Sequence, residues 1–111
     1  MQSEKMQSTQ NLINELVDGY IQSKYNKEYL KEKIHGVFEI IIPHIATIVK
    51  NTKEREPTKL WGSIKEDERI SSFFREAIEK IDRPIVIYIA SKFENNQYFG
   101  TKIIEEALKW K

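Results

Sequence analysis

The stretch LKEKIHGVFEIIIPHIATIV, residues 30–49, decides the fold of this 111-residue chain. Its apolar side chains recur every three or four positions, which is the period of an amphipathic helix. They are Leu30, Ile34, Val37, Phe38, Ile41, Ile45 and Ile48. The stripe stays in phase through Gly36 and Pro43. The pattern therefore predicts one helix, capped by Asn26 and kinked at Pro43, where a backbone hydrogen-bond donor is missing.

The same stretch does not predict a membrane span. Its most apolar part, residues 34–49, contains Glu39, two histidines and Pro43, and it falls short of the roughly 18 to 20 apolar residues that a span requires. The polar start of the chain, MQSEKMQSTQ, lacks the apolar core of a signal peptide. The chain has no cysteine, which is typical of an intracellular protein. We therefore expect a cytoplasmic protein that does not contact a membrane.

Apolar spacing predicts one helix before this stretch and one after it. Before it, a stripe from Leu12 to Ile21 predicts a helix over residues 9–24, with Ser8 or Thr9 as N-cap and a flexible segment at residues 1–8. After it, Ser63 and Glu66 have the spacing of a capping box. They precede a stripe that contains Ile70, Phe73, Phe74, Ala77, Ile78 and Ile81.

Residues 84–93 permit two interpretations. The β-branched run IVIYI favours a strand, whereas Asp82 as N-cap followed by Pro84 favours a helix. A helix is preferred, because a single strand would have no partner with which to pair. The pair Asn95 and Asn96 ends this helix, and Gly100 with Thr101 begins the last one. The predicted fold is a single all-α domain, residues 1–111, arranged as a small antiparallel bundle of about five helices.

Composition and motifs give little support for an enzyme. The two histidines, His35 and His44, lie nine residues apart on one helix, so they point to nearly opposite faces and cannot bind one metal ion together. The carboxylates alternate with lysines, as on a solvated helix face. Neither a nucleophile elbow nor a phosphate-binding loop is present. We therefore expect no catalytic residues, no metal and no cofactor.

A cationic segment follows the long helix and is the strongest candidate for a binding surface. Its sequence is KNTKEREPTKLWGS, residues 50–63, and it forms the one long connection, expected to be structureless over residues 51–63. The predicted nucleic-acid-binding residues are Lys50, Lys53, Arg55, Lys59 and Lys65 as phosphate contacts, with Trp61 as a face on which a base stacks. A row at Lys24, Lys27 and Lys31 would extend this surface if the two regions are neighbours. The alternative is a solvated connector whose tryptophan covers the core.

A second candidate surface is aromatic. Phe93, Tyr98, Phe99 and Trp110 lie near the ends of predicted helices, where a small bundle has difficulty burying every ring. Aromatic side chains in such positions are typical anchors of protein interfaces. The alternative is that they close the ends of the core of this domain itself.

In its whole-chain character the sequence resembles the small helical subunits of CRISPR effector complexes. The shared features are a length near a hundred residues, helices throughout, no cysteine, and abundant Lys, Glu and Ile without catalytic groups. The resemblance implies a non-enzymatic subunit of a ribonucleoprotein assembly in antiviral defence. It implies packing against larger subunits or other copies, and sequence-independent contact with RNA or single-stranded DNA. The competing hypothesis is a protein-binding inhibitor or immunity-type module, encoded by a phage or mobile element, without nucleic-acid contact.

Overall fold

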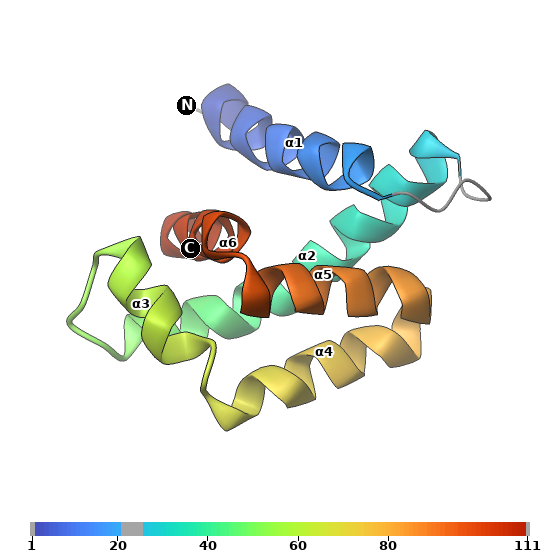
Figure 1. Ribbon diagram of the computed structural model, residues 1–111. Coiled ribbons are helices and arrows are strands. Elements are labelled where there is room, and N and C mark those ends of the chain that lie inside the picture. The colour runs from blue at the N-terminus through green and yellow to red at the C-terminus, as the bar shows by residue number, and fades with distance from the viewer. Residues whose placement is uncertain (1, 21–25, 111) are drawn as a thin grey trace.

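The computed structural model describes residues 2–20 and 26–110, with side chains described from Ser8 onward. In these ranges the chain forms six helices and no strand (Figure 1), which confirms the predicted all-α bundle. The helices are α1 (Gln2–Asp18), α2 (Lys27–Lys50), α3 (Pro57–Ile64), α4 (Glu68–Lys80), α5 (Arg83–Asn95) and α6 (Gln97–Lys109). None of them is long and apolar enough to cross a membrane.

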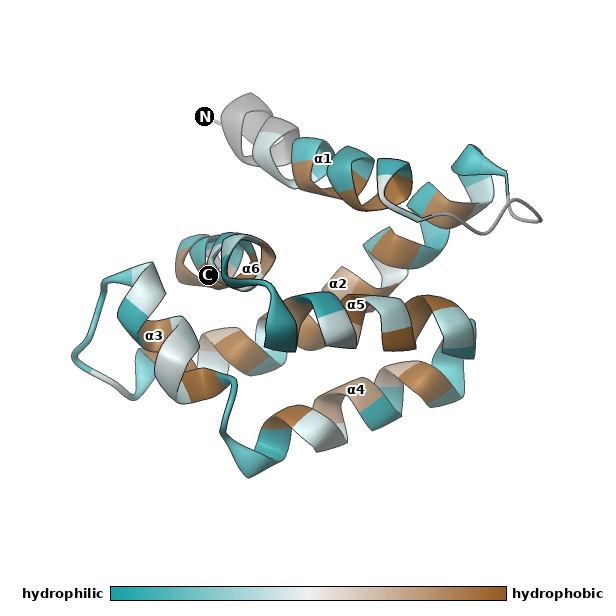
Figure 2. Ribbon diagram, viewed as in Figure 1, coloured by the Kyte–Doolittle hydropathy of each residue, from teal (hydrophilic) through white to brown (hydrophobic). Residues whose placement is uncertain are grey.

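The long helix α2 is the centre of the molecule and contacts α1, α4, α5 and α6. It runs without a break through Pro43, so the prediction of one continuous helix is confirmed. Asn26 caps it as expected, because its side chain accepts a hydrogen bond of 2.7 Å from the backbone N–H of Tyr29. Leu30, Ile34, Val37, Phe38, Ile41, Ile45 and Ile48 are all buried. Figure 2 shows the resulting alternation of apolar and polar residues along the helices.

The residues 84–93 are helical, which confirms the preferred interpretation of the β-branched run. Pro84 lies in the first turn of α5. Backbone N–H groups in a first turn have no acceptor within the helix, so the missing N–H of proline costs no helical hydrogen bond. Asp82 is the N-cap residue, but its carboxylate accepts a hydrogen bond of 2.9 Å from the Tyr29 hydroxyl rather than from the helix. This contact joins the start of α5 to the start of α2.

Three predicted helix boundaries are wrong. Helix α1 begins at Gln2 and ends at Asp18, so Ser8 and Thr9 lie inside it and cap nothing, while the predicted residues 21–24 are outside the described ranges. The predicted flexibility of residues 1–8 stays a prediction. Helix α4 is capped by Asp67, which accepts from the backbone N–H of Arg69 at 2.8 Å, and not by Ser63.

The third correction concerns the last helix. Asn96 ends α5 and also caps α6, accepting from the backbone N–H of Phe99, so α6 begins at Gln97 rather than at Gly100. An asparagine can perform both functions because its backbone ends one helix while its side chain accepts from the next. Gly100 is therefore an interior residue of α6. Its lack of a side chain leaves room for the Trp61 ring, which lies against this position.

Candidate nucleic-acid interface

The cationic segment lies at one corner of the molecule, where the chain leaves α2 and turns into α3 (Figure 1). The connection is mostly hydrophilic, as the teal colour of much of it in Figure 2 shows. It is shorter than predicted, because residues 57–64 form α3 instead of a structureless loop. Pro57 occupies the first turn of this helix, a favourable position for proline, and Leu60, Trp61 and Ile64 form its buried face.

Hydrogen bonds hold residues 51–56 in a defined turn. The Arg55 guanidinium donates from Nη1 to the carbonyl of Val49 at 3.1 Å and to that of Glu54 at 2.8 Å. The Glu54 carboxylate accepts from the backbone N–H groups of Glu56 at 3.0 Å and of Arg55 at 3.2 Å. These bonds, above all that from Glu56, hold the pKa of Glu54 below its usual range. Arg55 thus adds a donor to a carbonyl at the end of α2 that also accepts from Thr52, and in this way ties the turn to the helix.

Three lysines of this segment remain well exposed. Lys50 and Lys53 have no ion pair among the described residues, and the Lys59 ammonium lies 3.9 Å from Glu56 with 67% of its side chain exposed. A pair at that distance and exposure contributes little to stability and is readily exchanged for another anion. Lys50, Lys53 and Lys59 are therefore the cations of the segment that can meet a partner.

Trp61 does not present a stacking face. Its indole is only 9% exposed, and its Nε1–H donates to the carbonyl of Phe93 at 2.7 Å. The Lys65 ammonium covers the ring, 4.2 Å from its centroid. The prediction that a base stacks on Trp61 is thus wrong. The alternative interpretation is correct, because Trp61 covers the core. Lys65 is half-buried against the same ring.

The described part of the lysine row that would extend this surface is remote from it. Lys24 lies outside the described residues. Lys27 and Lys31 lie in the first turns of α2, whereas Lys50 is its last residue. At a rise of about 1.5 Å per residue, Lys27 and Lys50 are about 34 Å apart along the axis. The two cationic regions therefore form separate surfaces.

The four predicted interface aromatics divide into two exposed and two enclosed rings. Tyr98 is 49% exposed and Trp110 is 40% exposed. Phe93 is 1% exposed and belongs to the core, while Phe99 is half-buried and packs against it. Phe93 is therefore corrected to a core residue, because the side of α5 that carries it faces α4 and α3. Ile87, which is 45% exposed on α5, was not among the predicted interface residues.

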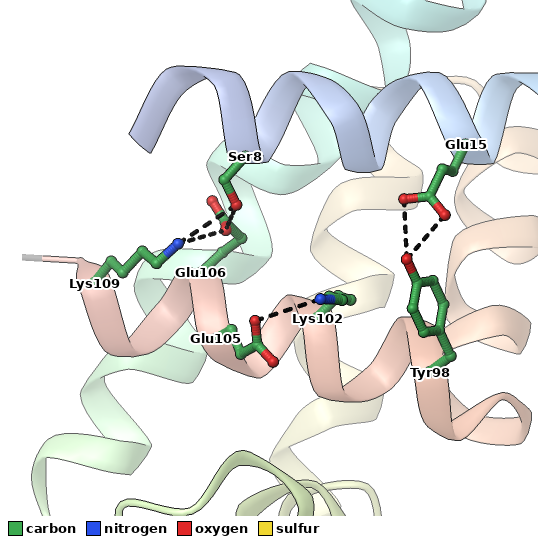
Figure 3. A network of polar contacts seen from close by, with 7 residues as sticks. All are labelled: Ser8, Glu15, Tyr98, Lys102, Glu105, Glu106 and Lys109. Atoms are coloured by element: carbon green, nitrogen blue, oxygen red, sulfur yellow. Dashed lines mark hydrogen bonds and ion pairs between the residues drawn. The ribbon is translucent and has the colours of Figure 1, made fainter. Parts of the chain in front are cut away.

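A polar network joins α1 to α6, as Figure 3 shows. The carboxylate of Glu106, only 5% exposed, accepts hydrogen bonds from the hydroxyls of Ser8 and Thr9 and lies 3.6 Å from the Lys109 ammonium. Farther along the same helix pair, the Tyr98 hydroxyl donates to Glu15 at 2.9 Å. Glu106 was expected on a solvated face, because glutamates and lysines alternate around it in the sequence. Its position beside the apolar stripe of Ile103 and Ala107 was the signal that could have shown its burial.

Each histidine has a carboxylate neighbour. His35 Nδ1 lies 3.5 Å from Glu39 Oε1. His44 Nε2 lies 3.1 Å from Glu76 Oε1. The His44 ring also stacks on the Phe73 ring, with centroids 4.4 Å apart. Among the residues whose side chains are described, no group of three or more His, Asp or Glu is placed to bind a metal ion.

The His44 contact predicts a dependence of stability on pH. The hydrogen bond with His44, and then that with Lys80, lower the pKa of Glu76 from its ordinary 4.5. Ionised Glu76 therefore stabilises the fold above that ordinary value, and the contribution is lost as pH falls through the lower folded pKa. We expect Glu76→Gln to be less stable than the wild type at pH 6, with the difference shrinking toward pH 3 in urea unfolding.

The charge-matched control is Glu79→Gln, an exposed position on the same helix. It measures the effect of removing one negative charge without removing the His44 contact. A deficit of Glu76→Gln that stays constant from pH 6 to pH 3 would show that the contact does not stabilise the charged carboxylate.

Comparison of the chain with protein-family models, with curated proteins and with solved structures finds no match in any of the three.

Proposed function

We propose that this chain is a non-enzymatic cytoplasmic subunit of a nucleoprotein assembly, of the kind represented by the small subunits of CRISPR effector complexes. It contacts the phosphates of RNA or single-stranded DNA through Lys50, Lys53 and Lys59. The observation that carries the proposal is the placement of three exposed ammonium groups around a turn that Arg55 and Glu54 hold in shape. Lys50 is the last residue of α2, Lys53 lies in the turn, and Lys59 lies in α3.

The order of this turn supports binding. A platform that is already fixed loses less conformational entropy on association than a mobile loop does. Ammonium groups recognise phosphate as point charges and do not read base edges. With Trp61 buried, the surface offers charge without stacking. The proposal therefore specifies contact with the backbone, independent of base sequence and strongly dependent on salt.

The experiment compares two triple variants in binding to labelled single-stranded RNA and DNA at 50 mM salt. The first, Lys50→Ala with Lys53→Ala and Lys59→Ala, removes the proposed contacts and leaves Arg55 to hold the turn. We expect its affinity to fall more than tenfold, because three phosphate contacts are lost. The structural check is an unchanged circular dichroism spectrum, since all three side chains are exposed.

The second triple variant is the control. Lys27→Ala, Lys31→Ala and Lys80→Ala remove the same total charge from the first turns of α2 and the end of α4. These positions lie near the Tyr29–Asp82 contact in the sequence, at the end of α2 opposite to Lys50. We expect it to bind nearly as well as the wild type. Equal losses in both variants would mean that net charge and not the cationic segment determines binding, and no binding by the wild type would remove the nucleic-acid proposal.

The exposed rings of Tyr98 and Trp110 favour a second candidate, a protein-binding module. An interface anchored by such rings depends on apolar burial, so raising the salt from 50 to 200 mM should change its affinity little. A partner that binds regardless of salt, and that the lysine variants do not affect, would support this function instead.

A further inference from the structure

A cleft opens where α1, α2 and the end of α6 meet. Its volume is about 270 Å³, slightly below the roughly 300 to 1,000 Å³ of pockets for drug-sized ligands, so it suits a smaller molecule. The residues that determine its chemistry are His35, Phe38, Glu39, Ile42, Glu106 and Trp110. None of them belongs to the cationic segment.

The interior of this cleft is apolar and aromatic. Phe38 and Ile42 come from the buried face of α2, with 2% and 4% exposure. The Trp110 side chain, 40% exposed, lines the cleft at the end of α6. An indole face is the best aromatic surface for a cation, which it attracts through the negative potential of its ring.

Two carboxylates supply negative charge to the same cleft. Glu39 is an exposed residue of α2, 3.5 Å from His35. Only 5% of Glu106 is exposed, and its carboxylate accepts a hydrogen bond of 2.6 Å from the Ser8 hydroxyl. Lys109, at 3.6 Å, offsets part of the charge of Glu106. A carboxylate fixed by hydrogen bonds in a largely water-excluded position interacts more strongly with an opposite charge than a solvated one does.

We propose that this cleft binds a small organic cation, an amine with an apolar body. The apolar body packs on Phe38 and Ile42, and the ammonium group lies between the Trp110 ring and the carboxylates of Glu39 and Glu106. A neutral ligand of the same shape gains the apolar contacts alone, and an anionic ligand is repelled by both carboxylates.

The probe is 2-phenylethylamine, followed by NMR shifts of the protein amide and indole N–H groups. The chain has two tryptophans, so its spectrum contains two indole signals, and Trp110→Phe identifies them. We expect the Trp110 signal to move on titration while that of Trp61 stays fixed, because the Trp61 N–H is bonded to Phe93. The expected dissociation constant is on the order of 1 mM for a ligand of this size.

Matched ligands and variants test the recognition of charge. 2-Phenylethanol, the neutral counterpart, should bind several-fold more weakly than the amine. Glu39→Gln should weaken amine binding roughly two- to five-fold, as expected for a partly solvated charge, and Glu106→Gln about tenfold. Glu79→Gln, an exposed change on α4 away from the cleft, should bind as the wild type does.

Equal binding of the alcohol and the amine would overturn the proposal, as would shifts that avoid the Trp110 indole. If Glu106→Gln unfolds, Glu39→Gln decides the question, because Glu39 is exposed and its replacement leaves the core intact. The triple lysine variant of the cationic segment should bind the amine with unchanged affinity. Failure of nucleic-acid binding and failure of amine binding are therefore separate results.

Discussion

Replacing Gly100 with alanine is expected to lower the free energy of unfolding by about 2 kcal/mol. A Cβ at this position would meet three atoms of the Trp61 ring, Cε2 at 2.7 Å and two others closer. Overpacking of this kind costs about 1 to 3 kcal/mol, and sometimes more. The displaced indole would also lose its bond to Phe93, worth about 1 kcal/mol. The gain of about 1 kcal/mol from better helix propensity offsets only part of this loss.

Gly62→Ala is the matched control for this prediction. Gly62 lies inside α3 and nothing is within 4 Å of a Cβ built there. The same substitution should therefore stabilise the protein by about 0.5 to 1 kcal/mol through helix propensity alone. Urea unfolding of both variants measures the difference. Similar free energies of unfolding for Gly100→Ala and Gly62→Ala would contradict the close approach of Trp61 to α6.

Replacing Trp61 with alanine is expected to cost about 3 to 5 kcal/mol, the range for large aromatic residues in a core. The ring joins three helices, since it lies in α3, contacts Gly100 of α6 and donates to Phe93 near the end of α5. That carbonyl lies in the last turn of α5, where no helical donor follows. The loss should appear in urea or thermal unfolding before any ligand is added.

Trp61→Phe separates the ring from its N–H group. It keeps most of the apolar contact but leaves the Phe93 carbonyl without this donor, so we expect a loss of about 1 to 2 kcal/mol. If Trp61→Ala instead kept full stability and weakened nucleic-acid binding, Trp61 would be a stacking face, contrary to its burial.

The sequence was sufficient to predict the fold where one helix face carries a long apolar stripe. Helix α2 is an example, since ten of its residues are buried and the period continues through Pro43. Residues 84–93 could be assigned because a lone strand has no partner, an argument that needs no tertiary contact. The first residues of the helices were harder to predict than the helices themselves. Ser63 and Asp67 both precede helical stripes, and only the folded backbone shows that Asp67 makes the capping bond.

Helix α3 could have been predicted but was not. Pro57 in a first turn, followed by Leu60, Trp61 and Ile64 on one face, is a helical pattern, but eight residues among charged neighbours resemble a loop. The burial of Trp61 could not be deduced locally, because it depends on Gly100, which is 39 positions away in the sequence. Arg55 likewise counts as a free cation in the sequence, and only its bond to Val49 shows its structural role.

The cleft also could not be predicted from the sequence. Its residues come from three helices, and Glu106 resembles its neighbour Glu105, which forms an ordinary surface pair with Lys102 at 3.8 Å. Burial of Glu106 results from the position of α1, whose Ser8 and Thr9 hydroxyls cover it. Such assignments require the arrangement of helices and not only their periods.

The salt dependence of wild-type binding to a homopolymeric single strand tests the proposed backbone contact. Three phosphate contacts predict a slope of about −2 in a plot of log affinity against log salt concentration, or a roughly tenfold to twentyfold loss between 50 and 200 mM. The triple variant lacking Lys50, Lys53 and Lys59 should lose that slope. A wild-type slope near zero, or one that the triple variant retains, would contradict a backbone contact through the cationic segment.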